Sequence, residues 1–230
     1  PQKLNRKGGL SNIRKDTKSK AKLLLDIGIN TNLAPVADTP YSKRDYIYYR
    51  TFSTSAKKNS KYIKTVIKEM GKNNLVSTLK HFPGYGNNGD THSQIIRDKR
   101  KLSTFKSRDL LPFKSGIKSG ADMIMVSHNI VDAFDKKHPA SLSKKVHKYI
   151  RNEMNYDGVI ITDGLGMNGV VDFVGGDKGE AAIKSVLAGN DMLCTNDYKI
   201  QYPAVLEAVK DGKIKEKQID ESVKRILILK

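Results

Sequence analysis

Residues 75–92 read LVSTLKHFPGYGNNGDTH, an apolar, β-branched run that ends at Lys80 and His81 and continues into a loop with three glycines and one proline. The run has the length and composition of a buried strand. Four other apolar runs also lead into polar residues at their C-terminal ends. They occupy residues 29–36, 123–128, 159–163 and 192–195. The repeated pattern predicts five buried strands, each followed by a polar loop.

Segments between these runs have the apolar spacing of amphipathic helices. Ser143 is the predicted N-cap of one helix, and Gly189 is the predicted C-terminal stop of another. The apolar stripes are Ile63, Val66, Ile67 and Met70; Val146, Tyr149, Ile150 and Met154; Ala182, Ile183, Val186 and Leu187; and Ile219, Val223, Ile226 and Leu227. Short buried strands that alternate with helices predict parallel βαβ units.

The polar strand ends predict an α/β fold of the (β/α)8 TIM-barrel type, because the active site of such a barrel gathers at the C-terminal ends of its strands. An open Rossmann sheet would need a glycine-rich first turn, and the chain has no G-x-G-x-x-G motif. Eight units at this strand spacing would need roughly 320 residues, whereas the chain has 230. We therefore expect one barrel domain over residues 1–230 that lacks its first two or three βα units or is completed by another piece.

The composition limits the classes of partner. Lys plus Arg outnumber Asp plus Glu by 42 to 24, a formal net charge of +18. This charge suits nucleic acid or an anionic surface such as a bacterial wall or membrane. The lysines are spread over all the expected helices, and neither Trp nor a zinc-finger or RNA-recognition motif occurs. We therefore expect no nucleic-acid partner. The chain contains no run of 18 apolar residues, so no transmembrane segment is predicted. Cys194 is the single cysteine, which excludes an internal disulfide and a zinc site built from cysteines.

Three residues are candidates for acid–base and nucleophilic chemistry. Asp90 and His92 are separated by one residue in the glycine-rich loop, so the carboxylate can orient the imidazole for proton transfer. The alternative is a solvated polar loop. Asp163 ends an apolar strand, where a carboxylate in a barrel would face the substrate. The alternative for Asp163 is the N-cap of the following helix.

The motifs together resemble the β-N-acetylglucosaminidase branch of glycoside hydrolase family 3. The resemblance covers nearly the whole chain, and KHFPGYG followed by DTH is its most specific part. Tyr85 stands where a histidine is common in the family. The matching segments are GINTNLAPVADT (28–39), RTF (50–52), KHFPGYG (80–86), DTH (90–92), SRDLLPF (107–113), MIMVSH (123–128), GVIITDGLGM (158–167), AGNDMLC (188–194) and ESVKRIL (221–227).

The resemblance implies a role for each matching residue. It implies that Asp163 is the nucleophile that forms a covalent glycosyl-enzyme, that His92 is the general acid/base and that Asp90 orients it. It further implies that the hydroxyls of the sugar are bound by Asp38, Arg50, Lys80 and His81. The implied activity is that of a retaining exo-glycosidase acting on terminal β-linked N-acetylglucosamine of glycans or peptidoglycan fragments, with no cofactor and no metal.

Two other functions stay open at the level of sequence. One is a family 3 β-glycosidase with a different hexose specificity, and the other is a non-catalytic barrel fragment that binds glycan or an anionic polymer. We expect His128 to be structural and His138 and His147 to lie on the surface. A monomer is expected. The positive charge and the implied wall-sugar chemistry favour an extracytoplasmic or cell-surface location in a bacterium.

Overall fold

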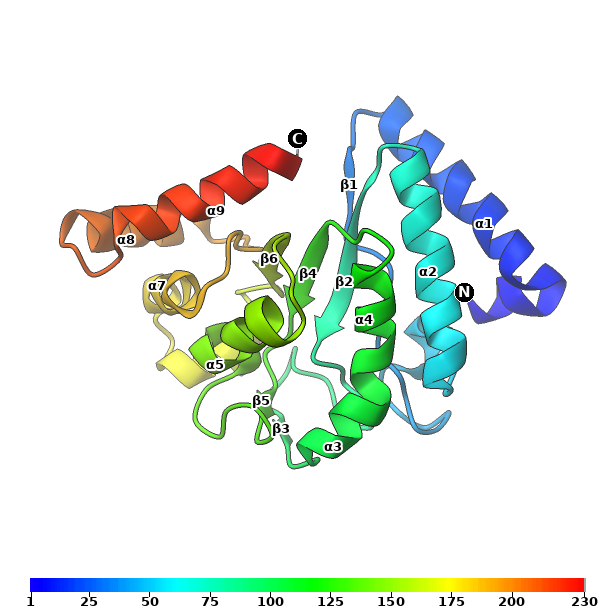
Figure 1. Cartoon of the computed structure of the whole chain (residues 1–230). Helices are drawn as coiled ribbons and strands as arrows, with labels where there is room; N and C mark the ends of the chain where they lie inside the picture. The colour runs from blue at the N-terminus through cyan, green and yellow to red at the C-terminus, as the bar shows by residue number, and fades with distance from the viewer. Residues whose placement is uncertain (230) are drawn as a thin grey trace. The chain divides into compact units, whose positions relative to one another are not determined.

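A computed structural model describes residues 1–229 (Figure 1). These residues divide into two compact units. The first unit comprises residues 1–89 and 103–124, and the second comprises residues 90–102 and everything from Met125 on. The division falls inside strand β4 (Met123–Val126). The single domain expected over residues 1–230 stays a prediction.

The strands of the first unit are parallel, as predicted. Strand β1 (Thr31–Asn32) pairs with β2 (Val76–Phe82), with Thr31 opposite Val76, and the first half of β4 follows β2 in the sheet order. The strand expected over residues 29–36 is shorter than predicted, with a single further bridge between Val36 and Lys80. Pro35 interrupts the ladder because it has no N–H to donate.

Helices α1 (Gln2–Asp26) and α2 (Ala56–Lys72) build the core of the first unit, and α4 (Leu110–Ile117) packs against α2. Helix α1 is interrupted at Gly8 and Gly9. The 3-10 turn η1 (Tyr48–Arg50), the short helix α3 (Leu102–Thr104) and the π-helical turn η2 (Phe105–Asp109) connect the longer elements. The core cluster contains Ile13, Ala21, Phe52, Val66, Met70 and Leu75. Within residues 1–229, no helix combines the length and apolarity needed to cross a bilayer.

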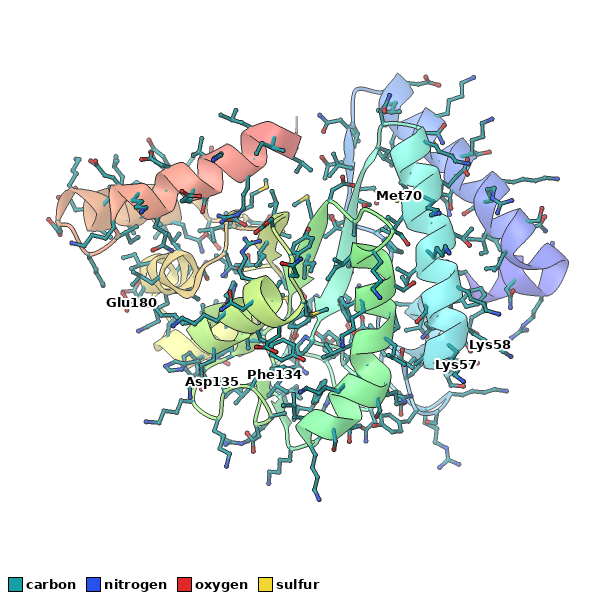
Figure 2. All side chains as sticks on the ribbon, in the orientation of Figure 1. Lys57, Lys58, Met70, Phe134, Asp135 and Glu180 are labelled. Atoms are coloured by element: carbon teal, nitrogen blue, oxygen red, sulfur yellow. The ribbon has the colours of Figure 1, made fainter. Side chains whose placement is uncertain are left out.

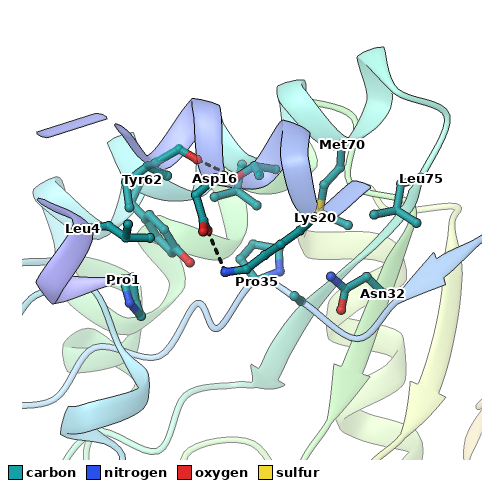
Figure 3. Close-up of a pocket in the computed structure, with 13 residues that line it drawn as sticks. Pro1, Leu4, Asp16, Lys20, Asn32, Pro35, Tyr62, Met70 and Leu75 are labelled. Atoms are coloured by element: carbon teal, nitrogen blue, oxygen red, sulfur yellow. Dashed lines mark hydrogen bonds and ion pairs between the residues drawn. The ribbon is translucent and has the colours of Figure 1, made fainter. Parts of the chain in front are cut away.

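A small cavity of about 100 Å³ lies in the first unit between α1, β1 and α2 (Figure 3). Its wall includes Tyr62, and burial raises the pKa of this phenol to about 12. Lys20 and Asp16 form an ion pair of 2.6 Å at its edge. None of the seven expected site residues lines this cavity.

The second unit continues the parallel pattern. The second half of β4 is followed in the sheet order by β6 (Val159–Thr162), and β3 (Arg97–Asp98) pairs in parallel with β5 (Ile130–Val131). The strand expected over residues 192–195 is reduced to one parallel bridge between Met192 and Ile161. The amides of Asp191 and Met192 both donate to the carbonyl of Ile160, at 2.7 and 3.1 Å, so a regular ladder does not form there.

Two predicted helix signals in the second unit are confirmed, the N-cap Ser143 and the stop Gly189. Ser143 caps α5 (Lys144–Lys148) by accepting from the amide of Val146, and the helix continues as the π-helical turn η4 (Tyr149–Glu153). Gly189 ends α7 (Lys178–Ala188) with a φ of 116°, which favours glycine. The remaining elements are η3 (Ala140–Leu142), α6 (Asn168–Val171), η5 (Asp172–Val174), α8 (Tyr198–Lys210) and α9 (Glu216–Leu229).

Candidate active site

The seven expected site residues fall into two groups, one in each unit. The first unit holds the residues expected to bind the sugar, Asp38, Arg50, Lys80 and His81. The second unit holds the residues expected to carry the chemistry, Asp90, His92 and Asp163.

Asp38 is fully buried and connects two segments of the first unit. Its Oδ2 accepts from the backbone amide of His81 at 3.0 Å and faces Nδ1 of the same residue at 2.8 Å, while its Oδ1 accepts from the amide of Tyr85 at 2.8 Å. The bridge between Val36 and Lys80 brings these segments side by side. Three donors on one carboxylate account for the burial of its charge.

The hydrogen bonds determine the tautomer of His81. A guanidinium can only donate, so the 3.1 Å contact between Arg50 Nη2 and His81 Nε2 makes Nε2 the acceptor. Nδ1 of a neutral imidazole must then carry the proton and donate it to Asp38. His81 is buried and Arg50 is exposed, so the chain of bonds from Asp38 through His81 presents an oriented guanidinium at the surface.

Lys80 is the remaining residue of the first group, and Tyr85 packs beside the group. The backbone of Lys80 pairs with the segment before Asp38, since its amide donates to Pro35 O at 3.2 Å and its carbonyl accepts from Ala37 N at 2.6 Å. The buried ring of Tyr85 lies edge-on to His81, with 5.3 Å between the ring centroids. An aromatic residue at this position therefore packs against the imidazole and helps to hold its plane.

Asp90 and His92 form a bonded pair in the second unit. Asp90 Oδ1 faces His92 Nδ1 at 2.5 Å and also accepts from the backbone amide of His92 at 3.0 Å. Nδ1 is therefore the donor toward the carboxylate, and Nε2 is the ring nitrogen available for proton exchange. The side chain of His92 is 59% exposed, so a substrate can reach it.

Asp163 is not a helix N-cap. Helix α6 begins at Asn168, and its N-cap position is occupied by Met167. Asp163 instead follows the last residue of β6, with its amide donating to Val126 O at 2.9 Å and its Oδ1 accepting from the amide of Gly164 at 2.9 Å. The helix-cap alternative is therefore wrong, and a half-exposed carboxylate lies at the C-terminal end of a buried parallel strand.

The loop that carries Asp90 and His92 is bonded to the segment that follows Asp163. The amide of Asn168 donates to His92 O and that of Gly169 to Thr91 O, both at 3.2 Å. A Cβ atom on Gly169 would lie 2.7 Å from Thr91 O, so only glycine allows this approach. Two backbone bonds therefore couple the acid–base pair to helix α6, which follows the turn that carries the carboxylate.

His128 lies behind the Asp163 turn and is completely buried. Its Nε2 donates to Gly164 O at 3.0 Å, and its Nδ1 accepts from Ser141 Oγ at 2.7 Å. Burial lowers the pKa of His128, the negative charge of Asp163 opposes this shift, and the charge of His92 adds to it. A neutral imidazole therefore supports the backbone next to the carboxylate. The structural role expected for His128 is confirmed, but the sequence did not indicate that its partner is the Asp163 turn.

The other two histidines differ from each other. His138 is 47% exposed, as predicted. The prediction that His147 lies on the surface is wrong, because its side chain is buried and its Nδ1 faces Ser143 O at 2.8 Å. Four lysines and arginines among residues 144–151 suggested a solvated helix, but the 3.6-residue period turns His147 inward. Within residues 1–229, no three His, Cys, Asp or Glu side chains gather into a metal site.

Comparison with known proteins identifies the family. The model described as "Glycosyl hydrolase family 3 N terminal domain" matches residues 1–229. The chain belongs to glycosyl hydrolase family 3. It is 30% identical to a beta-hexosaminidase of Methylococcus capsulatus over 186 residues, which are 80% of this chain and 55% of that protein. It is 34% identical to a beta-hexosaminidase of Idiomarina loihiensis over 184 residues, 79% of this chain and 54% of that protein.

A solved structure supports the same family. The glycoside hydrolase family 3 beta-N-acetylglucosaminidase from Paenibacillus sp. str. FPU-7 matches with a TM-score of 0.93 at 31% identity, over 99% of this chain and 44% of that chain. The predicted TIM-barrel-type α/β fold and the resemblance to family 3 are thereby confirmed. The chain spans about half the length of the curated relatives that it matches.

Proposed function

We propose that this family 3 chain carries the catalytic groups of a retaining exo-β-N-acetylhexosaminidase. The proposed substrate is a glycan or peptidoglycan fragment that ends in β-linked N-acetylglucosamine. The observation that supports it most is the Asp90–His92 pair, whose 2.5 Å contact leaves Nε2 of an exposed imidazole available in a loop bonded to helix α6, which follows the Asp163 turn. The beta-hexosaminidase names of its relatives agree with this substrate class.

The proposed reaction has two steps that balance in protons and charge. In the first, an Asp163 carboxylate oxygen attacks the anomeric carbon, the bond to the leaving oxygen breaks, and the protonated His92 gives its Nε2 proton to that oxygen. In the second, neutral His92 takes a proton from water, and the water oxygen displaces Asp163 from the sugar. Asp90 keeps Nδ1 protonated in both steps and stabilises the imidazolium.

Asp38, Arg50, Lys80 and His81 are proposed to form the sugar subsite, in which Arg50 and Lys80 donate to hydroxyls while Asp38 and His81 hold Arg50 in place. Arg50 suits this role because His81 orients its guanidinium, and guanidinium and ammonium groups donate hydrogen bonds to hydroxyl oxygens. Asp38 contributes mainly by orienting His81, since its oxygens already accept three hydrogen bonds.

Hydrolysis of 4-nitrophenyl N-acetyl-β-glucosaminide by the full chain tests the proposal. Asp163→Asn should lower kcat by about 10³-fold or more, since the nucleophile is lost. His92→Ala should lower kcat by about 10²-fold or more on an unactivated disaccharide and less on the nitrophenyl substrate, which needs little protonation of its leaving group. His138→Ala is the matched control, because His138 also contacts an aspartate, Asp135, at 3.0 Å. Unchanged disaccharide turnover by His92→Ala would contradict the proposal.

A further inference from the structure

Two adjoining hollows on the second unit form a basic surface around α5. The larger has a volume of about 660 Å³ and is lined by residues from α5, η4, the end of α7 and α9. The smaller has a volume of about 300 Å³ and lies between α5, α7 and the segment before η3. Lys144, Leu187 and Ala188 line both hollows, so the two are continuous along α5.

Cations predominate in both hollows. The larger is lined by six Lys or Arg side chains against two carboxylates, and the smaller by three lysines against one carboxylate. The cations are Lys144, Lys148, Arg151, Lys215, Lys217 and Arg225 in the larger hollow, and Lys144, Lys145 and Lys184 in the smaller. Although basic residues are spread over the whole sequence, the fold gathers these into one concave surface.

The carboxylates of the hollows do not neutralise the lysines. Asp191 is 1% exposed and is occupied by Arg151 at 2.6 Å and Arg225 at 3.2 Å. Asp135 accepts from Ser143 Oγ at 2.7 Å and faces His138 Nδ1 at 3.0 Å. Five further lysines line the hollows: Lys144, Lys145, Lys148, Lys215 and Lys217. Among residues 1–229, no carboxylate lies within 4 Å of the ammonium group of any of these five. The unpaired positive charge is therefore available to an external anion.

The described lining lacks the aromatic side chains on which the bases of single-stranded nucleic acid stack. None of the described residues that line the two hollows is Phe, Tyr or Trp. Binding of single-stranded nucleic acid depends on stacking of bases on aromatic rings as well as on phosphate contacts. We propose that these hollows bind a flexible polymer without bases through its phosphate groups, which the lysines of α5 and of residues 215 and 217 contact.

The larger hollow reaches the end of β6 away from Asp163, whereas the smaller hollow is lined by Leu142, which packs against Leu165 near the Asp163 turn. Arg151 donates to Gly158 O at 2.6 Å, just before the strand begins, whereas Asp163 follows its last residue. A strand of four residues is about 13 Å long. A polymer bound in the larger hollow therefore lies away from Asp163, and its binding can be measured without any assumption about hydrolysis.

Inorganic polyphosphate is the probe for this surface, with binding to the full chain measured by calorimetry at several salt concentrations. The test variant carries Lys144→Gln, Lys145→Gln and Lys148→Gln on α5. The control variant has the same change in charge, Lys57→Gln, Lys58→Gln and Lys61→Gln, at exposed positions of α2. Lys57 and Lys58 are labelled in Figure 2. Circular dichroism and thermal melting establish that both variants fold.

The α5 variant should bind polyphosphate at least about tenfold more weakly, and its plot of log K against log salt should be shallower by about 2 units, as expected for three lost phosphate contacts. The α2 variant should bind like the unmodified chain. Equal weakening by both variants, or no saturable binding, would overturn the proposal. Equally tight binding of single-stranded DNA with the same number of phosphates, or of poly-glutamate of equal charge, would overturn the assignment to a base-free phosphate polymer.

Discussion

The amide of Gly169 donates to the carbonyl oxygen of Thr91 at 3.2 Å, so the residue between Asp90 and His92 is bonded directly to helix α6, which follows the Asp163 turn. In this family 3 chain the proposed acid/base pair thus depends on contacts with the start of helix α6, five residues after the proposed nucleophile. Residues about 75 positions apart in the sequence form one hydrogen-bonded group.

A methyl group at position 169 should disturb this group. The added Cβ in Gly169→Ala would lie 2.7 Å from Thr91 O and 2.8 Å from Gln94 O, so the loop must move. We expect kcat for the chromogenic substrate to fall by about 10²-fold, because small misplacements of catalytic groups are costly. Gly166→Ala is the control, since its Cβ would meet only Asp197 Oδ2 at 3.7 Å. Equal activity of the two variants would show that the contact does not position the pair.

The same contact shows where sequence reasoning stops. The strand ends and the helix signals at Ser143 and Gly189 are local patterns, and they predicted the parallel α/β fold. The loop from 84 to 96 has no hydrophobic periodicity, so its hydrogen bonds with Asn168 and Gly169 could not be predicted from the sequence. The same holds for His128, whose partner Gly164 is 36 residues away.

Strand lengths were overestimated for a related reason. An apolar run predicts burial, whereas a ladder also requires regular donors and acceptors. Pro35 lacks a donor, and the amides of Asp191 and Met192 share one acceptor. The surface position expected for His147 is wrong because the helical period turns its side chain inward, although lysines surround it in the sequence.

Asp38→Asn should destabilise the chain. The amide keeps the shape of the side chain but has one acceptor where the carboxylate has two, so its NH2 group would face the donor of Tyr85 or those of His81. We expect the free energy of unfolding in urea to fall by about 1–3 kcal/mol. KM should rise as well, because His81 would no longer orient Arg50. Asp26→Asn, at an exposed position of the same unit, should leave both quantities unchanged.

Stability should decrease on mild acidification because of two histidines. Burial is the main cause that lowers the pKa of both His128 and His147 below the value of about 6.5 in an unfolded chain. Above pH 6.5 the imidazoles are neutral in both states. As the pH falls through 6.5, the unfolded chain binds protons first, and the free energy of unfolding falls by up to about 1.4 kcal/mol for each unit of pKa difference.

Urea denaturation between pH 7.5 and pH 5 measures this effect. His147→Asn should reduce the slope of stability against pH, because it removes one of the two buried imidazoles. Carboxylates whose pKa is lowered in the folded chain also make stability depend on pH, but in a lower pH range than the histidines. Glu180 is one, because a hydrogen bond from Lys184 lowers its pKa, and its contribution is lost only below about pH 4.5. A slope in His147→Asn equal to that of the unmodified chain would contradict the assignment to His147.

Asp191→Asn should be the most damaging of these substitutions. The buried carboxylate accepts from the amide of Ile160 at 2.8 Å and from Ser222 Oγ at 2.9 Å, and it pairs with Arg151 and Arg225. Its removal leaves two guanidinium groups without a counter-charge, so we expect a loss of about 3–5 kcal/mol in the free energy of unfolding. Added polyphosphate should restore part of that loss, because an anion in the adjoining hollow can partly replace the carboxylate. A loss below about 1 kcal/mol, the range expected for an exposed pair, would show that solvent already screens both arginines.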